Sequence, residues 1–459
     1  MKLSLGCDQP LLKDSQKALD ICIVIRTLCF VGFLVLAHNT LANHEDDHFT
    51  DKIYSFNGFA TFAGAKPLTT GDERSINDFL QEDDEVDLKN HNTLGMRLTA
   101  NLDDKLTLTA QMVSKGVNDY DADFDWIYAE YAFSSQWHIA IGRIRTPLFM
   151  YSEFVDVGYA YQWVQAPTEI YNLVDYPFQS MESVRLRYNI TLNGWDNEFL
   201  AWIGSSADPL YTNGIDAELE LKEAWGVAFT TSHDWLTLRS VYFTGLTSAD
   251  LSNIDILGQP NHQFTHDNGT PLFINNEGGQ QTYFNELNRL NRLTKNDISK
   301  DIIWENDRGE YLSIGLALNF EYIFVNAEVT QATVDNALII PKVLAGYLMI
   351  GYQINPSWSI SYTYGRDKNS VNEAPWRNIT RSPTNNTAQL AQDLAIFEQI
   401  TQESGIYFQE AENQSDKVNI RFDFHAKAAV KFEYWQEDQQ TPSRDNHPKG
   451  IRLGLDLIF

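Results

Sequence analysis

Arginines that alternate with apolar residues are the first candidates for chemistry in this sequence. In "ESVRLRYNI", at 182–190, two arginines flank a leucine. Five arginines share such a setting: Arg97, Arg185, Arg187, Arg421 and Arg452. Because a guanidinium stays charged and binds carboxylates and phosphates in a fixed geometry, these residues could attract or select charged solutes. Possible acidic counterparts lie in the aromatic-rich stretch "YSEFVDVGYAYQWVQAPTEIYNLVDYPFQ", at 151–179: Glu153, Asp156, Glu169 and Asp175.

Other kinds of chemistry find less support. The ten histidines show no arrangement beside a serine or aspartate nucleophile of the kind that a hydrolase needs. The stretch "NHEDDH", at 43–48, could bind a divalent ion, but a short acidic tail is more simply explained as solvated. A formal net charge of -28 argues against nucleic acid, whose phosphates need a basic surface. We therefore expect no enzyme, no metal site and no cofactor.

The first 42 residues have the layout of a secretory signal peptide. Three lysines precede the apolar run "ICIVIRTLCFVGFLVLA", and a small-residue cleavage site ends at Ala42 or Ala37. The alternative is a transmembrane anchor, but Arg26 interrupts the run and leaves it short of the roughly 20 residues that a spanning helix needs. We expect a signal peptide over 1–42 and a periplasmic N-terminal tail over 43–52. All three cysteines precede the cleavage site, so the mature chain has no thiol.

The remaining chain, 53–459, alternates apolar and polar residues in about sixteen segments, as membrane-spanning strands do. We expect strands near 53–65, 92–102, 105–115, 124–134, 137–147, 182–192, 196–205, 219–232, 235–247, 309–320, 322–333, 342–354, 357–367, 416–426, 428–438 and 450–459. Tight turns such as "LNG" at 192–194 alternate with longer polar connections, among them 66–91, 148–181, 206–218, 248–308, 368–415 and 439–449. All tight turns then lie at one rim and all long loops at the other.

Each segment has an apolar side and a polar side. Val418 and Ile420, for example, alternate with Asn419 and Arg421. A charge that faces lipid at mid-depth costs about 2–4 kcal/mol, so the polar sides are expected to line a wet lumen. The pattern predicts an all-β transmembrane antiparallel up-and-down barrel of about 16 strands. A soluble β protein with an ordinary apolar core is the alternative, but it would not need polar alternates along almost every strand.

Two local features bear on the details of this barrel. Aromatic residues at segment ends suit girdles at the two membrane interfaces, among them Trp126, Tyr128, Trp137 and Tyr352. Arg143 and Arg145 interrupt the alternation of their segment, which indicates a β-bulge or a rim position.

The end of the chain resembles a known targeting signal. "GIRLGLDLIF", at 450–459, alternates and ends in an aromatic, and its Leu455, Leu457 and Phe459 resemble the assembly signal of Gram-negative outer-membrane proteins. The signal peptide, the thiol-free mature chain and the strand number look like the trimeric porins of that membrane. "GRIRTPLFMYSEFVDVGYAYQWVQAPTEIY" also looks like the corresponding stretch of porin-like proteins from marine gammaproteobacteria. The resemblance implies a multi-pass outer-membrane location, a homotrimer, and contacts with lipid, lipopolysaccharide and the barrel-assembly machinery.

The resemblance also implies a role for the third long connection, 148–181. In porins this loop folds into the barrel, and its acids face a basic wall across a constriction. By that likeness Glu153, Asp156, Glu169 and Asp175 would face Arg97, Arg185, Arg187, Arg421 and Arg452. The alternative is an aromatic extracellular loop at a trimer or partner interface, and any one arginine could merely pair with a carboxylate of a neighbouring strand.

The function that these observations favour is passive diffusion of small hydrophilic solutes and ions through a water-filled channel. A substrate-specific channel for sugars or anions is the main alternative, and a closed structural or enzymatic barrel is a weaker one. The basic wall would favour anions, whereas acidic loops such as "QEDDEVD" at 81–87 and the total charge favour a mild preference for cations.

Overall fold

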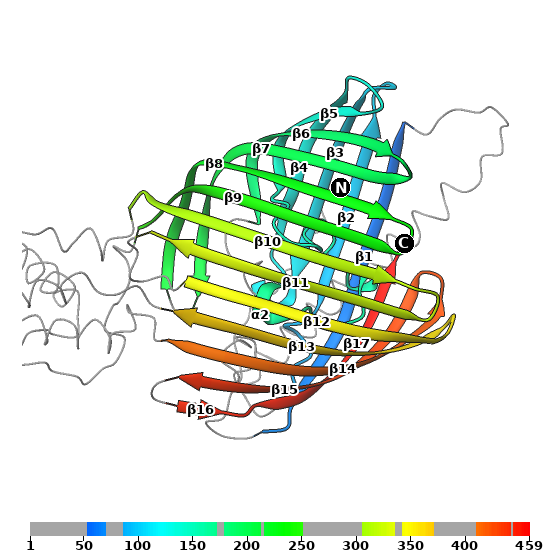
Figure 1. Ribbon diagram of the computed structural model, residues 1–459, viewed down its shortest axis with the longest axis vertical. Helices are drawn as coiled ribbons and strands as arrows, with labels where there is room; N and C mark the ends of the chain where they lie inside the picture. The colour runs from blue at the N-terminus through cyan, green and yellow to red at the C-terminus, as the bar shows by residue number, and fades with distance from the viewer. Residues whose placement is uncertain are drawn as a thin grey trace, which may run out of the picture. The chain divides into compact units, whose positions relative to one another are not determined.

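The computed structural model describes residues 53–69, 86–171, 179–212, 215–250, 305–335, 342–370, 410–441 and 444–459. These residues form one sheet of antiparallel strands that closes on itself (Figure 1). The expected signal peptide and N-terminal tail lie outside the described residues, as do most of the connections 66–91, 248–308 and 368–415. Among the described residues, no helix is long and apolar enough to cross a membrane.

The strands follow one another around the barrel in chain order. They are β1 Tyr54–Pro67, β2 Thr93–Asn101, β3 Leu106–Lys115, β4 Ala122–Ala132, β5 Trp137–Arg145, β6 Ser180–Leu192, β7 Trp195–Thr212, β8 Ile215–His233, β9 Leu236–Asp250, β10 Asp307–Asn319, β11 Ile323–Val334, β12 Lys342–Asn355, β13 Trp358–Ser370, β14 Ala411–His425, β15 Ala428–Thr441, β16 Arg444–Asn446 and β17 Lys449–Ile458. Three short helices occur among the described residues: η1 Gly116–Asn118, η2 Gly158–Ala160 and α2 Thr168–Tyr171.

The last long strand closes the barrel against the first. β17 pairs with β1 over a register that runs from Phe59–Ile458 to Pro67–Gly450. Beyond it, Gly58 and Phe459 exchange two backbone hydrogen bonds of 2.9 Å each. An open strand edge would leave backbone groups unsatisfied in hydrocarbon, and this pairing removes it. The predicted closed antiparallel barrel is confirmed.

Two predicted connections differ from the structure. A seventeenth strand, β16, pairs with β15 inside the connection expected at 439–449. The connection expected at 206–218 is mostly strand, because β7 and β8 remain paired from Ser206–Leu221 to Thr212–Ile215. Backbone ladder bonds need no apolar alternation. Strands can therefore continue past the apolar band where a sequence pattern reads as a polar loop.

The apolar side of most strands faces outward. Ile203 and Ile314 are 62% and 59% exposed, whereas their neighbours Trp202 and Ser313 on the other face are each 3% exposed. Trp137 and Tyr352 are also exposed, as interface girdles require. Trp126 and Tyr128 are not girdle residues, which corrects the expectation. Trp126 is buried under Arg97, and Tyr128 lies beneath Arg185 on the inner face.

The inner face is not polar all round, and this also corrects the sequence analysis. Inward residues of β7–β12 form an apolar wall: Leu200, Trp202, Ala228, Val241, Phe243, Tyr311, Tyr347 and Met349. Residues of the third long connection pack on this wall, including Phe149, Trp163, Ile170 and Tyr171. The barrel therefore contains a hydrophobic core on one side of its lumen. The feature of the sequence that indicates this core is the high aromatic content of the third long connection.

Candidate functional site

The chain between β5 and β6, residues 146–179, is here called loop 3, and its described part, 146–171, crosses the inside of the barrel (Figure 1). Its polar contacts with the wall include, in order along the loop, Pro147 O with Arg239 of β9 (3.0 Å), Met150 N with Glu328 of β11 (3.1 Å), Gly158 O with Lys431 of β15 (2.5 Å), Tyr159 O with Arg421 of β14 (2.8 Å) and Trp163 Nε1 with Thr363 of β13 (2.8 Å). These partners surround the lumen on several sides. The predicted inward fold of the third loop is therefore confirmed.

A buried lysine holds the middle of loop 3. Lys431 Nζ donates to Gly158 O at 2.5 Å and to Trp163 O at 2.9 Å, and it lies 2.8 Å from Asp456 Oδ2 of β17. Thr61 Oγ1 of β1 donates to the other carboxylate oxygen of Asp456 at 2.6 Å. Burying a charge is costly unless it is paired and hydrogen-bonded. The backbone of loop 3 supplies part of that compensation, so the position of the loop and the ionic network stabilise each other.

A second buried carboxylate, Glu433 of β15, contacts loop 3 at Val164. Glu433 Oε2 accepts hydrogen bonds from Val164 N at 3.1 Å and from Asn419 Nδ2 at 2.7 Å. Its other oxygen accepts one from Arg452 Nη1 at 2.7 Å. Glu433 and Arg452 are 0% and 2% exposed. Arg452 thus acts on loop 3 through Glu433.

A third anchor lies on β11. Glu328 accepts hydrogen bonds from the Tyr171 hydroxyl at 2.7 Å, the Ser313 hydroxyl at 2.9 Å and the amide of Met150 at 3.1 Å. Burial, followed by the charge of Glu328, raises the pKa of Tyr171 well above its ordinary value. Tyr171 therefore stays a neutral hydrogen-bond donor, and both ends of the described loop converge on one carboxylate.

The predicted acids of loop 3 have different surroundings. Glu153 is half exposed, and its Oε1 lies 3.7 Å from Arg185 Nη1. Glu169 is buried and accepts a hydrogen bond from Ser415 of β14. Asp175 lies outside the described residues. Glu153 is thus the acid of the predicted set, among those described, that faces solvent.

Asp156 joins loop 3 to the wall through two cations. Its carboxylate lies 3.1 Å from Lys115 Nζ of β3 and 2.6 Å from Arg145 Nη2 of β5. Burial alone would raise its pKa, but Arg145 and Lys115 hold the pKa of Asp156 well below its ordinary value. Arg145 also contacts Asp125 of β4 at 3.2 Å and the carbonyl of Ser152 at 3.2 Å. Asp156 therefore fixes the loop near β3 and β5.

The irregularity expected around Arg143 and Arg145 is present as an unusual backbone conformation at Gly142, although the pairing of β5 with β4 and β6 shows no bulge there. Gly142 has a φ of 137°, in a region that L side chains rarely adopt. The backbone turns there, so Arg143 pairs with Glu182 at 2.8 Å on the outer face while Arg145 points inward to loop 3. Arg145 is a site residue that the sequence analysis did not include in the predicted basic wall, because it interrupts the alternation of its segment.

The predicted arginines divide into two groups. Arg421 is 8% exposed, donates to the carbonyls of Tyr159 and Tyr161 at 2.8 Å each, and pairs with Asp423 at 2.7 Å. Arg421 and Arg452 therefore lie beneath loop 3. The second group, on β2 and β6, consists of Arg97, Arg185 and Arg187.

Arg185 and Arg187 of the second group form a charged cluster with β4 and β7. Arg187 lies 3.2 Å from Glu130 and 3.7 Å from Glu198. Arg185 lies 3.8 Å from the same Glu130, and it is the partner of Glu153 described above. Side chains of Arg187, Glu130 and Glu198 are 24%, 20% and 35% exposed, so water reaches this cluster. The cluster and Glu153 are the part of the predicted constriction that is open to solvent.

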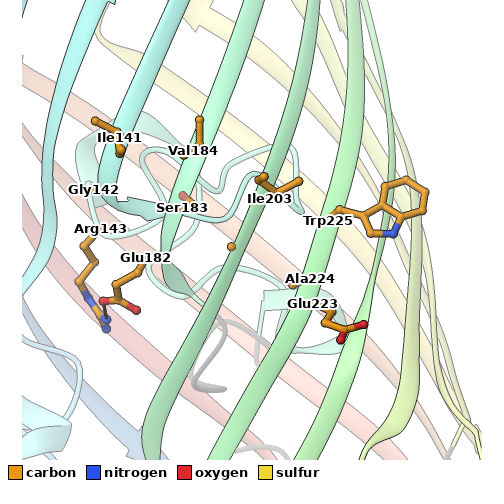
Figure 2. A pocket seen from close by; sticks show the side chains of 11 residues that line it. Ile141, Gly142, Arg143, Glu182, Ser183, Val184, Ile203, Glu223, Ala224 and Trp225 are labelled. Atoms are coloured by element: carbon orange, nitrogen blue, oxygen red, sulfur yellow. Dashed lines mark hydrogen bonds and ion pairs between the residues drawn. The ribbon is translucent and has the colours of Figure 1, made fainter.

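A hollow on the outer face is separate from this site. It is lined by Ile141, Val184, Ile203 and Trp225, beside the Arg143–Glu182 pair (Figure 2). Ile141 and Ile203 both pair with Val184 in the register, and Val184 lies on the face opposite Arg185. The hollow therefore faces away from the lumen and belongs to the lipid-facing wall.

Comparison with known proteins supports the fold. No family model and no curated protein sequence matches the chain. Among solved structures, the outer membrane channel DcaP of Acinetobacter baumannii matches 88% of this chain and 97% of its own, with 10% identity and a TM-score of 0.51. Pseudomonas putida OprB matches 89% of this chain and 95% of its own, with 11% identity and a TM-score of 0.50. An anion-selective porin from Comamonas acidovorans matches 88% of this chain and 99% of its own, with 10% identity and a TM-score of 0.48.

At such low identity the likeness concerns the fold, and the physical observations agree with it. Strands close without an edge, apolar residues face outward, and loop 3 lies inside. Only a closed barrel lets strands cross hydrocarbon, and such barrels are those of the outer membrane. The chain therefore has the fold of the Gram-negative outer-membrane porins and is a multi-pass protein of that membrane.

Proposed function

We propose that the protein is a passive channel for small hydrophilic solutes and ions, with its constriction between Glu153 of loop 3 and Arg97, Arg185 and Arg187 of the wall. The observation that carries the proposal is the contrast between the two sides of loop 3. On the β7–β15 side the loop packs against apolar residues and buried ion pairs. On the β2–β6 side its Glu153 is 51% exposed beside Arg185, whose side chain is 6% exposed, and the neighbouring Arg187 is 24% exposed.

In this proposal the two groups of arginines act differently. Arg97 and Arg187 touch the passing solute, Arg185 contributes its charge from beneath the surface, and charge and diameter together select what crosses. Arg421 and Arg452 hold loop 3 in place, with Asp156 and Glu169 as further anchors. The proposal assigns no catalytic step to any residue.

The test is planar-bilayer conductance of the refolded protein, with the reversal potential recorded across a potassium chloride gradient. Stepwise ohmic channels are expected, and the sign of the reversal potential decides between the acidic mouth and the basic wall. A silent bilayer from protein that still shows heat-modifiable migration in SDS would reject the channel and favour a closed barrel.

We further propose that the barrel is a homotrimer, in contact with lipopolysaccharide and inserted by the barrel-assembly machinery. The support is the porin fold and the lipid-facing apolar band. Mass measurement of the detergent-solubilised protein by light scattering tests the oligomer. A mass of one chain after correction for detergent would contradict it.

A further inference from the structure

Among the residues that the structure describes, Arg97 has no carboxylate partner, which distinguishes it from the other predicted arginines. Its Nε donates to Gln111 Oε1 at 2.8 Å, and its guanidinium lies over the Trp126 ring, 4.2 Å from the centroid. Within the described part of the chain, these contacts leave Nη1 and Nη2 without a hydrogen bond. By contrast, Arg185, Arg187, Arg421 and Arg452 each lie within 4.0 Å of an acid.

The neighbours of Arg97 fix its orientation. Gln111 is 2% exposed, and its Nε2 donates to Asp125 Oδ2 at 3.2 Å, which turns its carbonyl oxygen toward Arg97. Asp125 is itself held by Arg145 Nη2 at 3.2 Å and Ser180 Oγ at 3.0 Å. A chain of hydrogen bonds therefore determines which edge of the guanidinium is free.

Trp126 fixes the plane in which that edge lies. The ring is 7% exposed and cannot swing into the lumen without losing its packing. A guanidinium stacked on an aromatic face keeps its charge, and its in-plane N–H groups point away from the ring centre. Arg97 thus presents two donors to the passage in a fixed plane, which is the arrangement that a planar anion with two oxygens accepts.

We propose that Arg97, set by Gln111 and Trp126, is a binding site for the carboxylate of small organic acids on their way through the channel. The inference rests on the proposed function and names a class of solute for it. Glu153 and Asp125 act electrostatically on Arg97 from the same side of the lumen as Arg145. Binding in a pore must stay weak enough for release, and neighbouring acids provide that limit.

The experiment measures potassium chloride conductance in planar bilayers while lactate is added, with glycerol as the uncharged probe. For the wild-type channel we expect a saturable fall in conductance with lactate and none with glycerol. For Arg97→Gln the half-saturating lactate concentration should rise about tenfold or more, because a charge-assisted bidentate contact is lost. Arg97→Lys keeps the charge but loses the planar fork, and a rise of about threefold is expected.

Arg143→Gln is the matched control, because it removes the same charge from an arginine that pairs with Glu182 on the outer face, away from the lumen. Its half-saturating concentration should change less than about threefold. Ohmic channels with no lactate dependence, or with equal dependence in wild type and Arg97→Gln, would overturn the carboxylate site and leave the channel standing. Absence of channels from the folded wild-type protein would overturn both. If Arg97→Gln does not fold, Arg97→Lys decides, and an unchanged half-saturation overturns the site.

Discussion

Lys431 of β15 and Asp456 of β17 form an ion pair of 2.8 Å under loop 3, with side chains 0% and 3% exposed. The same ammonium donates to two loop carbonyls, Gly158 O and Trp163 O. Barrel closure and loop placement therefore share one buried network.

Lys431→Met is expected to lower the free energy of unfolding by about 3–5 kcal/mol, because Asp456 would be left as a buried unpaired charge. Urea unfolding of the detergent-solubilised barrel, followed by tryptophan fluorescence, measures it. Lys431→Met combined with Asp456→Leu should cost less than Lys431→Met alone. Lys222→Met is the control at the exposed pair with Glu220, where the change should stay below about 1 kcal/mol. Equal losses at the two lysines would contradict the network.

Ion selectivity should respond to Glu153 and much less to Asp156. Glu153→Gln removes a solvent-exposed negative charge beside Arg185, so the reversal potential should shift toward anions. Asp156→Asn removes a buried charge that Lys115 and Arg145 already neutralise, so it should chiefly lower stability. The measurement is the zero-current potential of each variant and of the wild type across a tenfold salt gradient, with expected potentials on the order of tens of millivolts. A larger selectivity shift for Asp156→Asn would place the constriction elsewhere.

The lowered pKa of Asp156 predicts how the anchoring of loop 3 depends on pH. Its pKa is held well below the ordinary value, so the stability that it contributes is fully present above the unfolded value of about 4 and is lost as pH falls through the native value. We expect no loss from this group between pH 7 and pH 5, and a progressive loss below about pH 4. Unfolding of wild type and Asp156→Asn at a series of pH values tests this. The difference in unfolding free energy between wild type and Asp156→Asn should shrink below about pH 4. A difference that already shrinks by about pH 6 would contradict the anchoring role of the Asp156 carboxylate.

Phe459 tests the proposed assembly signal, Leu455, Leu457 and Phe459. Its ring lies against Gly58 of β1, and its side chain is 45% exposed. Phe459→Ala is expected to reduce the amount of heat-modifiable barrel in the outer membrane several-fold while refolding in detergent stays near wild type. Phe424→Ala, at an outward aromatic of β14 that is 51% exposed, is the control and should insert normally. Equal defects in cells and in detergent would indicate a stability role for Phe459 instead.

The sequence by itself determined the barrel. Period-two alternation assigned Ile314 to one face and Ser313 to the other, and the even alternation of tight turns and long connections required antiparallel closure, which β1 and β17 provide. Side-chain direction in a strand depends only on parity, so this information is local. For the same reason parity failed where the backbone leaves regular strand geometry, as at Gly142 before Arg143 and Arg145.

Only the tertiary structure decided what each inward residue does. Parity places Arg97 and Arg452 alike on the inner face, but Arg452 is buried under loop 3 whereas Arg97 stays partly exposed. It likewise buries Asp156 and exposes Glu153, three residues apart. The path of loop 3 follows from its fit to an apolar wall contributed by strands far along the chain. Such contacts depend on which residues meet in space, and no local spacing encodes them.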